Sequence, residues 1–525
     1  MNSALSFGIV FEKRSICFRF SQWCERKDGV MGNSSKSYYA AADLGASSGR
    51  VILGSLIDGR MELSDVNRFE NGPVEHADGI HWNATELFEN IREGFNKAVQ
   101  KSDGQLKSVG IDTWGVDYGR LDKNDELLEQ PFHYRDPRTE TAVEAFFKVV
   151  PAEKLYELTG LQVQPFNTVF QLASASKQEG WDATETILFT PDLLTFWLTG
   201  KKVSEVTIAS TSGILDPVTR QWSPGVVEAL EEDFGIPVPG ILAPLVEPGT
   251  IVGKSLPEVL DESVDVVAVG GHDTASAVVA VPAATKDFAF ISSGTWSLVG
   301  MELTKPVMTE SSRHANLTNE LGVEKTVRYL QNIMGMWVFN ECRRVWKDQG
   351  RELSLKELDA LAEELPPLQY VVDINDPRLF PVCDMPARLR EVAAESGQDL
   401  PDDQGIITRC IMDSLALAYK NAIAQEEDMA GQKVEVLHIV GGGCKNKLLC
   451  QLAAESTGLP VVAGPTEGTA LGNLLVQAHA LGDITGGLDA MREVSRNSVD
   501  VARYLPGTLP ISKDAWDEAN KRIGK

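Results

Sequence analysis

The chain has 525 residues, a length at which one hydrophobic core usually gives way to two domains. Its formal net charge of −26 argues against a nucleic-acid-binding protein and against docking on anionic lipids, because both need a basic surface. Seven cysteines are scattered without a Cys-x-x-Cys pair, which is typical of reduced thiols in a cytoplasmic protein rather than of a disulfide framework or a zinc site.

The first 30 residues mix aromatic, basic and cysteine residues with neither helical nor alternating order, and a second Met-led start follows at Met31. No uninterrupted apolar stretch or small-residue cleavage site marks a signal peptide, and no segment is long and apolar enough to span a membrane. We therefore expect residues 1–36 to be a disordered leader, with the fold beginning at about Tyr38.

The stretch 38–69 predicts three strands joined by two turns, GASSG (45–49) and Asp58-Gly59. A small Gly/Ser-rich turn exposes consecutive backbone amides, which can cradle a phosphate without lysines. Asp43 ends the first strand, where it could hold Mg²⁺ beside such phosphates. Taken alone, a turn-forming Asp is the commoner explanation.

The next segments predict a mixed α/β fold. Residues 106–121 read as strand, 189–200 as a helix that ends at Gly200, and the Pro-rich segment 236–249 as a surface loop. Residues 263–269 are rich in β-branched side chains and predict a buried strand, and 274–280 predicts a helix.

Asp273 lies where that strand ends and that helix begins, directly after Gly270, Gly271 and His272. Two interpretations are open. The carboxylate could cap the helix, since Asp accepts hydrogen bonds from the free amides of a first turn. It could also be aimed into a site as a general base.

The strand–turn–strand pattern of the first segment returns at 288–303, with the turn around Gly294. Aligning Gly45 with Gly294 sets Ala46 opposite Thr295 and Ser48 opposite Ser297. This similarity of context predicts a duplication, in which each of two related domains offers one phosphate-binding hairpin. The Pro/Ala segment 280–287 is the expected boundary.

In the second unit, residues 327–346 and 408–430 predict helices. Residues 433–458 predict a strand, a triple-glycine turn at 441–443 and a helix, an arrangement that lets a nucleotide lie against bare backbone. The same glycines would also suit a tight turn without a ligand. Two amide-rich hairpins, this turn and the two aspartates together indicate a two-lobed phosphoryl transferase with Asp273 as base.

Seven motifs occur in order: AADLGASSGRV, GIDTWGVD, YRDPRT, HDTASAV, SSGTWSLVG, QNIMGMW and LHIVGGGCKN. From about Tyr38 to Gly482 the chain resembles the FGGY carbohydrate kinase family, and within it the bacterial enzymes that phosphorylate L-rhamnulose. The resemblance implies an α/β fold with two ribonuclease H-like (actin-like ATPase) domains flanking a cleft. The implied N-terminal domain spans residues 37–281 and contains the sugar site, the base and the first phosphate loop. The implied C-terminal domain spans 282–482 and contains the nucleotide site, and residues 483–525 form an extension.

The implied reaction is transfer of the ATP γ-phosphate, with Mg²⁺, to O1 of L-rhamnulose. The alternatives are a kinase for another ketose, such as L-fuculose or a pentulose, and a non-catalytic sugar or nucleotide sensor on the same fold. The implied partners are the sugar and ATP, with no nucleic acid or membrane, in a monomer or dimer.

The resemblance carries roles over to particular residues. Asp273 matches the proton acceptor, and Asp43 would position Mg²⁺. The sugar-contacting positions are matched by Gly115, His272, Asp273, Thr274 and Asn332, and the nucleotide-contacting positions by Ala46, Ser47, Ser48, Gly49, Arg50, Thr295 and Gly442. Asn340 also falls at a nucleotide position, but the family has the longer Gln there, so Asn340 would reach the nucleotide through water or make no contact with it.

Overall fold

The first sheet is built around the predicted hairpins. The computed structural model describes residues 36–176, 178 and 180–524, so the expected leader lies outside the described residues except for Lys36. Strands β1 (Ser37–Leu44), β2 (Ser48–Ile57) and β3 (Arg60–Glu70) pair antiparallel, as predicted. Asp58 and Gly59 join β2 to β3 with φ of 48° and 74°, the left-handed conformation that a two-residue hairpin turn needs.

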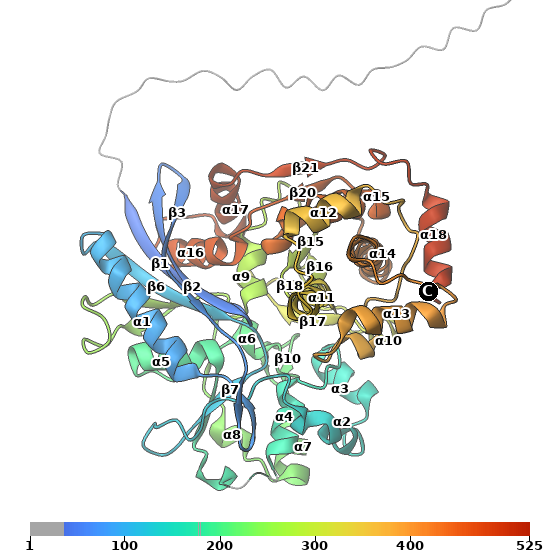
Figure 1. Ribbon diagram of the computed structural model, residues 1–525. Helices are drawn as coiled ribbons and strands as arrows, with labels where there is room; N and C mark the ends of the chain where they lie inside the picture. Colours follow the sequence, from blue (N-terminus) through green and yellow to red (C-terminus); the bar gives the residue numbers. More distant parts are fainter. Residues whose placement is uncertain (1–35, 177, 179, 525) are drawn as a thin grey trace, which may run out of the picture. The chain divides into compact units, whose positions relative to one another are not determined.

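Three more strands complete this sheet: β6 (Leu106–Thr113), β13 (Thr250–Lys254) and β14 (Asp265–Ala268). The order is β13-β14-β6-β1-β2-β3, with β6 parallel to both β1 and β14. Figure 1 labels β1, β2, β3 and β6 of this sheet. Helices α1 (Ala84–Lys101) and α5 (Thr190–Thr199) cover one face, and α16 (Gly468–Ala480) and α17 (Gly487–Ser498) the other.

Strand β1 shows how the alternation of side chains serves both faces. Ala40, Ala42 and Leu44 pack with α1 and α5, whereas Tyr39 and Ala41 pack with α16. Successive side chains in a strand point to opposite faces, so a strand covered on both sides is apolar throughout. By the same alternation Asp43 belongs to the face that α16 covers.

A second sheet repeats this topology. Its order is β17-β18-β16-β15-β19-β20-β21, with antiparallel pairing across β15, β16 and β18 and parallel pairing across β15, β19 and β20. The strands are β15 (Phe288–Ser293), β16 (Ser297–Leu303), β17 (Thr318–Leu321), β18 (Val327–Ile333), β19 (Val436–Val440), β20 (Val461–Ala463) and β21 (Ala502–Tyr504). The series β15, β16, β18, β19, β20 and β21 matches β1, β2, β3, β6, β14 and β13 in position and direction within the sheet, so the predicted repeat is confirmed. The chain order differs at one edge, because β13 precedes β14 whereas β21 follows β20.

The two turns at 45–48 and 294–296, which the sequence predicts to bind phosphate, differ in length. Leu44 pairs with Gly49 across the first turn, whereas Ser293 pairs with Ser297 across the second. The first turn is therefore one residue longer, and the residue equivalent to Ser297 is Gly49, not Ser48 as the ungapped alignment suggested.

Two secondary-structure predictions were wrong. Residues 327–333 form strand β18, and only 337–348 form a helix, α11 (Trp337–Asp348). A short apolar run has no period that separates a buried strand from a helix, and here pairing with β16 and β17 decided for the strand. The segment 236–249 is not a surface loop, because Ile236, Val238 and Ile241 are buried in one hydrophobic cluster. Val238 and Ile241 belong to helix α8 (Val238–Ile241), and Ile236 lies two residues before it.

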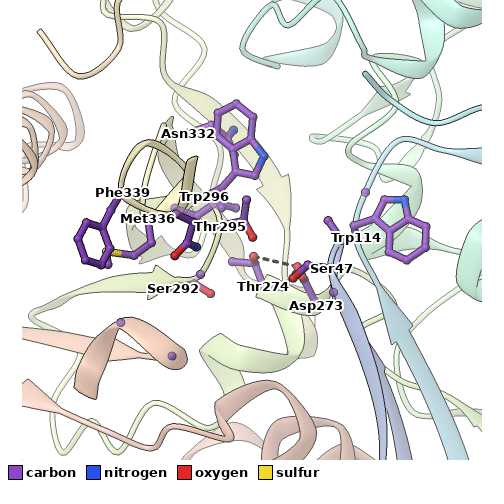
Figure 2. A pocket seen from close by; sticks show the side chains of 18 of the residues that line it. Ser47, Trp114, Asp273, Thr274, Ser292, Thr295, Trp296, Asn332, Met336 and Phe339 are labelled. Carbon is purple, nitrogen blue, oxygen red and sulfur yellow. Dashed lines mark hydrogen bonds between the residues drawn. The ribbon is translucent and has the colours of Figure 1, made fainter. Parts of the chain in front are cut away.

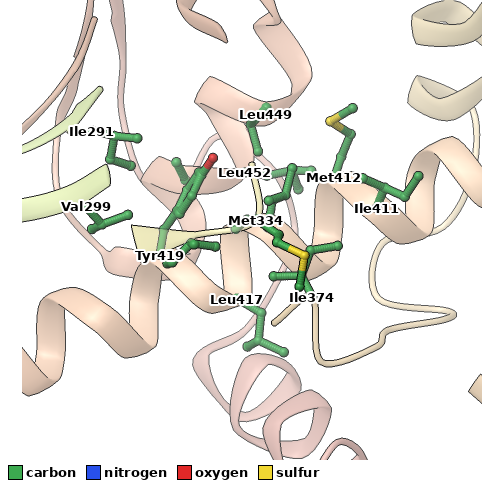
Figure 3. Close-up of a cluster of buried hydrophobic side chains, with 14 of the residues drawn as sticks. Ile291, Val299, Met334, Ile374, Ile411, Met412, Leu417, Tyr419, Leu449 and Leu452 are labelled. Atoms are coloured by element: carbon green, nitrogen blue, oxygen red, sulfur yellow. The ribbon is translucent and has the colours of Figure 1, made fainter. Parts of the chain in front are cut away.

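The largest core lies on the second sheet. Predicted helix α14 (Gln404–Ala430) is confirmed, and with α11 it belongs to one hydrophobic cluster on this sheet. Figure 3 shows residues of α14 and of α15 (Lys447–Thr457) beside Ile291 and Val299. Helix α9 (Asp273–Val279) lies between the sheets: it packs on α16 and contacts both β6 and β15. Near the end of the chain, β21 extends the second sheet and α18 (Lys513–Arg522) packs on α14. The segment 280–287 contains no helix or strand.

The remaining elements surround these cores. The helices are α2 (Glu140–Phe147), α3 (Ala152–Thr159), α4 (Thr168–Ala175), α6 (Val206–Ala209), α7 (Pro224–Phe234), α10 (Glu310–His314), α12 (Leu355–Glu363) and α13 (Met385–Glu395). The short strands pair as β4 (Val74–His76) with β5 (Gly79–His81), β7 (Tyr118–Leu121) with β8 (Thr186–Phe189), β9 (Ser204–Glu205) with β12 (Leu245–Val246), and β10 (Leu215–Asp216) with β11 (Gln221–Trp222). None of the described helices combines the length and hydropathy that crossing a membrane requires.

Candidate active site

A pocket of about 1040 Å³ is lined by residues from the ends of both sheets (Figure 2). It brings together most of the predicted site residues: Ala46, Ser47, Ser48, Gly115, His272, Asp273, Thr274, Thr295, Asn332, Asn340 and Gly442. Asp43, Gly49 and Arg50 do not line it. Residues that are more than 200 positions apart in the chain therefore share one cavity, large enough for a nucleotide and a small second ligand.

The two turns offer free amides to this pocket. Gly45 N donates to Ser48 O and Gly294 N to Trp296 O, which closes each turn. Among the described residues, the amides of Ala46, Ser47 and Thr295 have no hydrogen-bond partner. Unpaired amides that face a pocket can bind anionic oxygens, and they do so without adding a positive side chain.

Gly49 and Arg50 have structural surroundings. A Cβ at Gly49 would overlap the ring of Phe69, so packing across β2 and β3 requires the glycine. The Arg50 guanidinium donates to Asp43 Oδ2 from Nε at 3.0 Å and from Nη2 at 2.6 Å, and it forms a further ion pair with Glu467. Arg50 is therefore held by two carboxylates beside the first turn.

Asp112, which the sequence interpretation missed, lies next to Asp43. The two residues are register partners on β6 and β1. Asp112 is fully buried, its Oδ2 accepts a 2.6 Å hydrogen bond from Asn473 Nδ2, and its Oδ1 has no partner among the described residues. Burial, together with the charge of Asp43, raises the pKa of Asp112 well above its ordinary value. The available signal was a charged side chain within the mostly apolar segment 109–112 of a predicted strand.

Asp273 is the first residue of α9, and the glycines before it are required by close contacts. A Cβ at Gly270 would lie 2.9 Å from Ser276 N, and one at Gly271 would lie 2.8 Å from Glu205 Oε2. Glu205 Oε2 also accepts a 2.9 Å hydrogen bond from Gly271 N, which fixes the loop that carries Asp273. The loop is therefore positioned by contacts distant in sequence.

The N-cap of α9 is His272, so the interpretation of Asp273 as the helix cap is wrong; among the described residues its carboxylate accepts hydrogen bonds only from the next residue, and it lines the pocket. Its Oδ1 accepts hydrogen bonds from Thr274 N at 2.6 Å and Thr274 Oγ1 at 3.2 Å. Burial raises its pKa, and the charge of Asp43 adds to the rise while His272 opposes it. A carboxylate with a raised pKa in a pocket is suited to accept a proton.

The opposite wall of the pocket is held by Gln162, another residue that the sequence did not single out. Gln162 Oε1 accepts from Asn332 N at 3.1 Å and from Asn332 Nδ2 at 3.0 Å. Asp117 has a similar supporting role: its carboxylate accepts from the indole N–H groups of Trp82 and Trp114, at 2.7 and 3.0 Å. Asp117 thereby anchors the loop that carries Gly115.

The triple-glycine turn divides into structural and exposed positions. A Cβ at Gly441 would lie 2.8 Å from Ser293 O, and one at Gly443 would overlap the Ser293 side chain. Gly442 has no heavy atom within 4 Å of its Cβ position and lines the pocket. Gly441 and Gly443 thus serve the turn, and Gly442 is free to face a ligand. Asn340 lines the pocket from α11.

Two family domains match the chain. Residues 38–280 match the N-terminal domain of the FGGY family of carbohydrate kinases, and residues 289–481 match its C-terminal domain. The chain belongs to the FGGY family of carbohydrate kinases. It is 40% identical over 493 residues to a rhamnulokinase of Bacteroides thetaiotaomicron, a match that covers 92% of this chain and 98% of the relative. It is 41% identical over 457 residues to a rhamnulokinase of Enterococcus faecalis, covering 86% and 90%.

Solved structures of sugar kinases share the fold of this FGGY kinase. A gluconate kinase from Lactobacillus acidophilus superposes with a TM-score of 0.74 at 16% identity, covering 93% of this chain and 96% of that one. A Plasmodium falciparum glycerol kinase with ADP superposes with a TM-score of 0.75 at 16% identity, covering 93% and 98%. The expected fold class, two α/β domains of the actin-like ATPase type, is confirmed, and so is an enzyme that phosphorylates a sugar.

The carboxylates around Asp43 fit part of a magnesium site, although neither Asp43 nor Asp112 lines the pocket itself. Among the described residues no three His, Cys, Asp or Glu side chains are arranged to hold a metal by themselves. Mg²⁺ usually takes only one or two carboxylates, with phosphate oxygens and waters as its other ligands. Asp43 and the unpartnered Oδ1 of buried Asp112 can supply that share.

Proposed function

We propose that this FGGY kinase transfers the γ-phosphate of ATP to O1 of L-rhamnulose, giving L-rhamnulose 1-phosphate and ADP in L-rhamnose catabolism. The observation that carries the proposal is Asp273, a half-buried carboxylate that lines the same pocket as the free amides of both turns. The rhamnulokinase relatives support L-rhamnulose as the sugar, since they match nearly the whole chain.

Asp273 is the proposed base. A sugar hydroxyl is a poor nucleophile near neutral pH, and a carboxylate within hydrogen-bond reach can align it and accept its proton as the bond to phosphorus forms. Gly115, His272, Thr274 and Asn332 are the proposed sugar contacts. Gln162 keeps Asn332 in place through two hydrogen bonds, so its role is to support the sugar site.

The nucleotide is proposed to lie between the two turns and Gly442. The amides of Ala46, Ser47 and Thr295 would bind phosphate oxygens, with Ser48 and Asn340 alongside. Binding by amides explains how a chain of net charge −26 can hold a triphosphate. Gly49 and Arg50 would contribute indirectly, Gly49 by packing on Phe69 and Arg50 by orienting Asp43.

Asp43, with Asp112 beside it, would hold Mg²⁺. The ion supplies charge neutralisation between the phosphates when it is bound. The two carboxylates lie at paired positions of adjacent strands, so they are placed by the sheet and not by a loop. We further propose that the enzyme acts in the cytoplasm on free sugar and ATP, in agreement with its scattered cysteines and acidic surface.

A turnover assay on a panel of ketoses tests this function. ADP release is measured with L-rhamnulose, L-fuculose and L-xylulose, and ³¹P and ¹³C NMR of the product then locate the phosphate. We expect the largest kcat/KM with L-rhamnulose and a phosphate on C1. A larger kcat/KM with another ketose would reassign the substrate, and the absence of ADP release with all three would favour a sensor on the same fold.

A further inference from the structure

Behind His272 lies a buried ion pair from the second sheet. Glu320 on β17 and Arg328 on β18 are register partners, and Arg328 Nη1 lies 2.9 Å from Glu320 Oε2. Arg328 is 0% exposed, and its Nε donates to Leu321 O at 3.1 Å. A buried ion pair adds little stability compared with apolar packing, so stability alone gives no reason for a guanidinium at this position.

Arg328 contacts the ring of His272. Its Nη1 donates a hydrogen bond to His272 Nδ1 at 3.1 Å. Glu320 Oε2 also lies 3.1 Å from that nitrogen, but it makes no hydrogen bond among the described residues. The other ring nitrogen, Nε2, lies 3.4 Å from Asp273 Oδ1, and both His272 and Asp273 line the pocket.

The contact with Arg328 determines where the imidazole proton lies. A guanidinium has only N–H donors and keeps its charge, so its hydrogen bond to Nδ1 forms only when that nitrogen carries no proton. In the neutral ring the proton is then on the other nitrogen. Glu320 Oε2, at the same distance, favours a proton on Nδ1 instead, so the two neighbours compete. We infer that Arg328 is a positioning residue that keeps the proton of His272 on Nε2, so that the sugar site presents a hydrogen-bond donor next to the Asp273 carboxylate.

A donor beside an acceptor specifies the chemistry of the group that binds there. Asp273 needs a hydroxyl that can give up a proton, and His272 Nε2–H needs an adjacent oxygen that can accept a hydrogen bond. The C1 hydroxyl and C2 oxygen of a ketose supply this pair on neighbouring carbons. This last step rests on the proposed function, whereas the position of the proton does not.

Nitrogen NMR tests the position of the proton directly. The full chain is labelled with ¹⁵N in its histidine rings, and a His272→Gln variant identifies the His272 signals among those of the seven histidines. At a pH near 8 we expect a protonated Nε2 and a bare Nδ1. A protonated Nδ1 in the unaltered chain would overturn the inference.

Variants of Arg328 then test its cause. In Arg328→Met the donor is gone and Glu320 remains beside Nδ1, so we expect Nδ1 to gain a proton and the KM for the ketose to rise about tenfold, with the KM for ATP unchanged. Arg328→Lys keeps a charged side chain that can only donate hydrogen bonds, so Nδ1 should remain without a proton. An Nδ1 without a proton in folded Arg328→Met would contradict the role of Arg328. If that variant does not fold, the spectrum of the unaltered chain still tests which ring nitrogen of His272 carries the proton. Inactivity on L-rhamnulose with a protonated Nε2 would refute the proposed substrate and leave this inference standing.

Discussion

Gly472 of α16 lies directly against the backbone of Ser276 in α9, so that a Cβ at position 472 would overlap the Ser276 carbonyl oxygen. This contact sets how closely the two helices cross, and α9 carries Asp273 at its first residue. We expect Gly472→Ala to push α9 outward, lower the free energy of unfolding by about 1–3 kcal/mol and reduce kcat. Urea denaturation measures the free energy of unfolding, and initial rates measure kcat. Gly72→Ala, with no heavy atom near its Cβ position, is the matched control and should change neither.

Replacing the proposed base should affect the chemical step far more than binding. We expect Asp273→Asn to lower kcat by about 10²–10⁴-fold, because the amide cannot accept the proton, while the KM values for sugar and ATP change little. Steady-state kinetics of the purified variant measure this. Asp261→Asn, which neutralises an exposed carboxylate, serves as the control. Unchanged turnover in Asp273→Asn would remove Asp273 from the role of base.

The pH dependence of kcat/KM should report the same group. Burial raises the pKa of Asp273, the charge of Asp43 adds to the rise, and His272 opposes it. A base acts in its unprotonated form, so kcat/KM should rise with pH through a pKa above the ordinary value of about 3.9 for Asp. A pH–rate profile in buffers of constant ionic strength measures this rise of kcat/KM with pH. A pKa at or below the ordinary value would show that the half-buried position of Asp273 does not disfavour its charged form.

Loss of Asp43 should change the use of magnesium. The Asp43 carboxylate is oriented by Arg50, and its partner Asp112 has one oxygen left free. We expect Asp43→Ala to raise the Mg²⁺ concentration for half-maximal activity at least about tenfold, because an oxygen ligand is removed. Titration of activity with Mg²⁺ at saturating ATP gives the value. The exposed Asp65→Ala on β3 is a suitable comparison, and an unaltered Mg²⁺ titration in Asp43→Ala would show that the metal lies elsewhere.

Glu205 should make the protein less stable as the pH rises towards neutrality. Burial raises the pKa of Glu205 to about 7. In the unfolded chain the pKa of a Glu is about 4.3, so between about pH 4.3 and the folded pKa the folded state holds the proton more tightly. The free energy of unfolding therefore falls as the pH rises through this range, by on the order of 3 kcal/mol from this group. Denaturation at several pH values should give a flatter slope for Glu205→Gln. An identical slope would show that Glu205 does not titrate in this range.

Local sequence was sufficient for the hairpins and for the position of Asp273. Asp58-Gly59 adopts the left-handed turn that those residue types favour, and the strand–glycine–helix order around Asp273 was read from neighbours in the chain. Such features depend on backbone preferences over a few residues. The duplication could also be predicted, because each copy repeats the same local pattern.

The folded structure alone decided the contacts that join distant segments. Residues 327–333 became a strand because β16 and β17 pair with it, and Ile236 and Ile241 are buried because other segments cover them. Gln162, Asp112 and Arg328 acquire their roles only beside Asn332, Asp43 and His272. A hydrogen bond or ion pair depends on the distance between two groups in space, and a side chain's type and its place in the chain do not contain that distance.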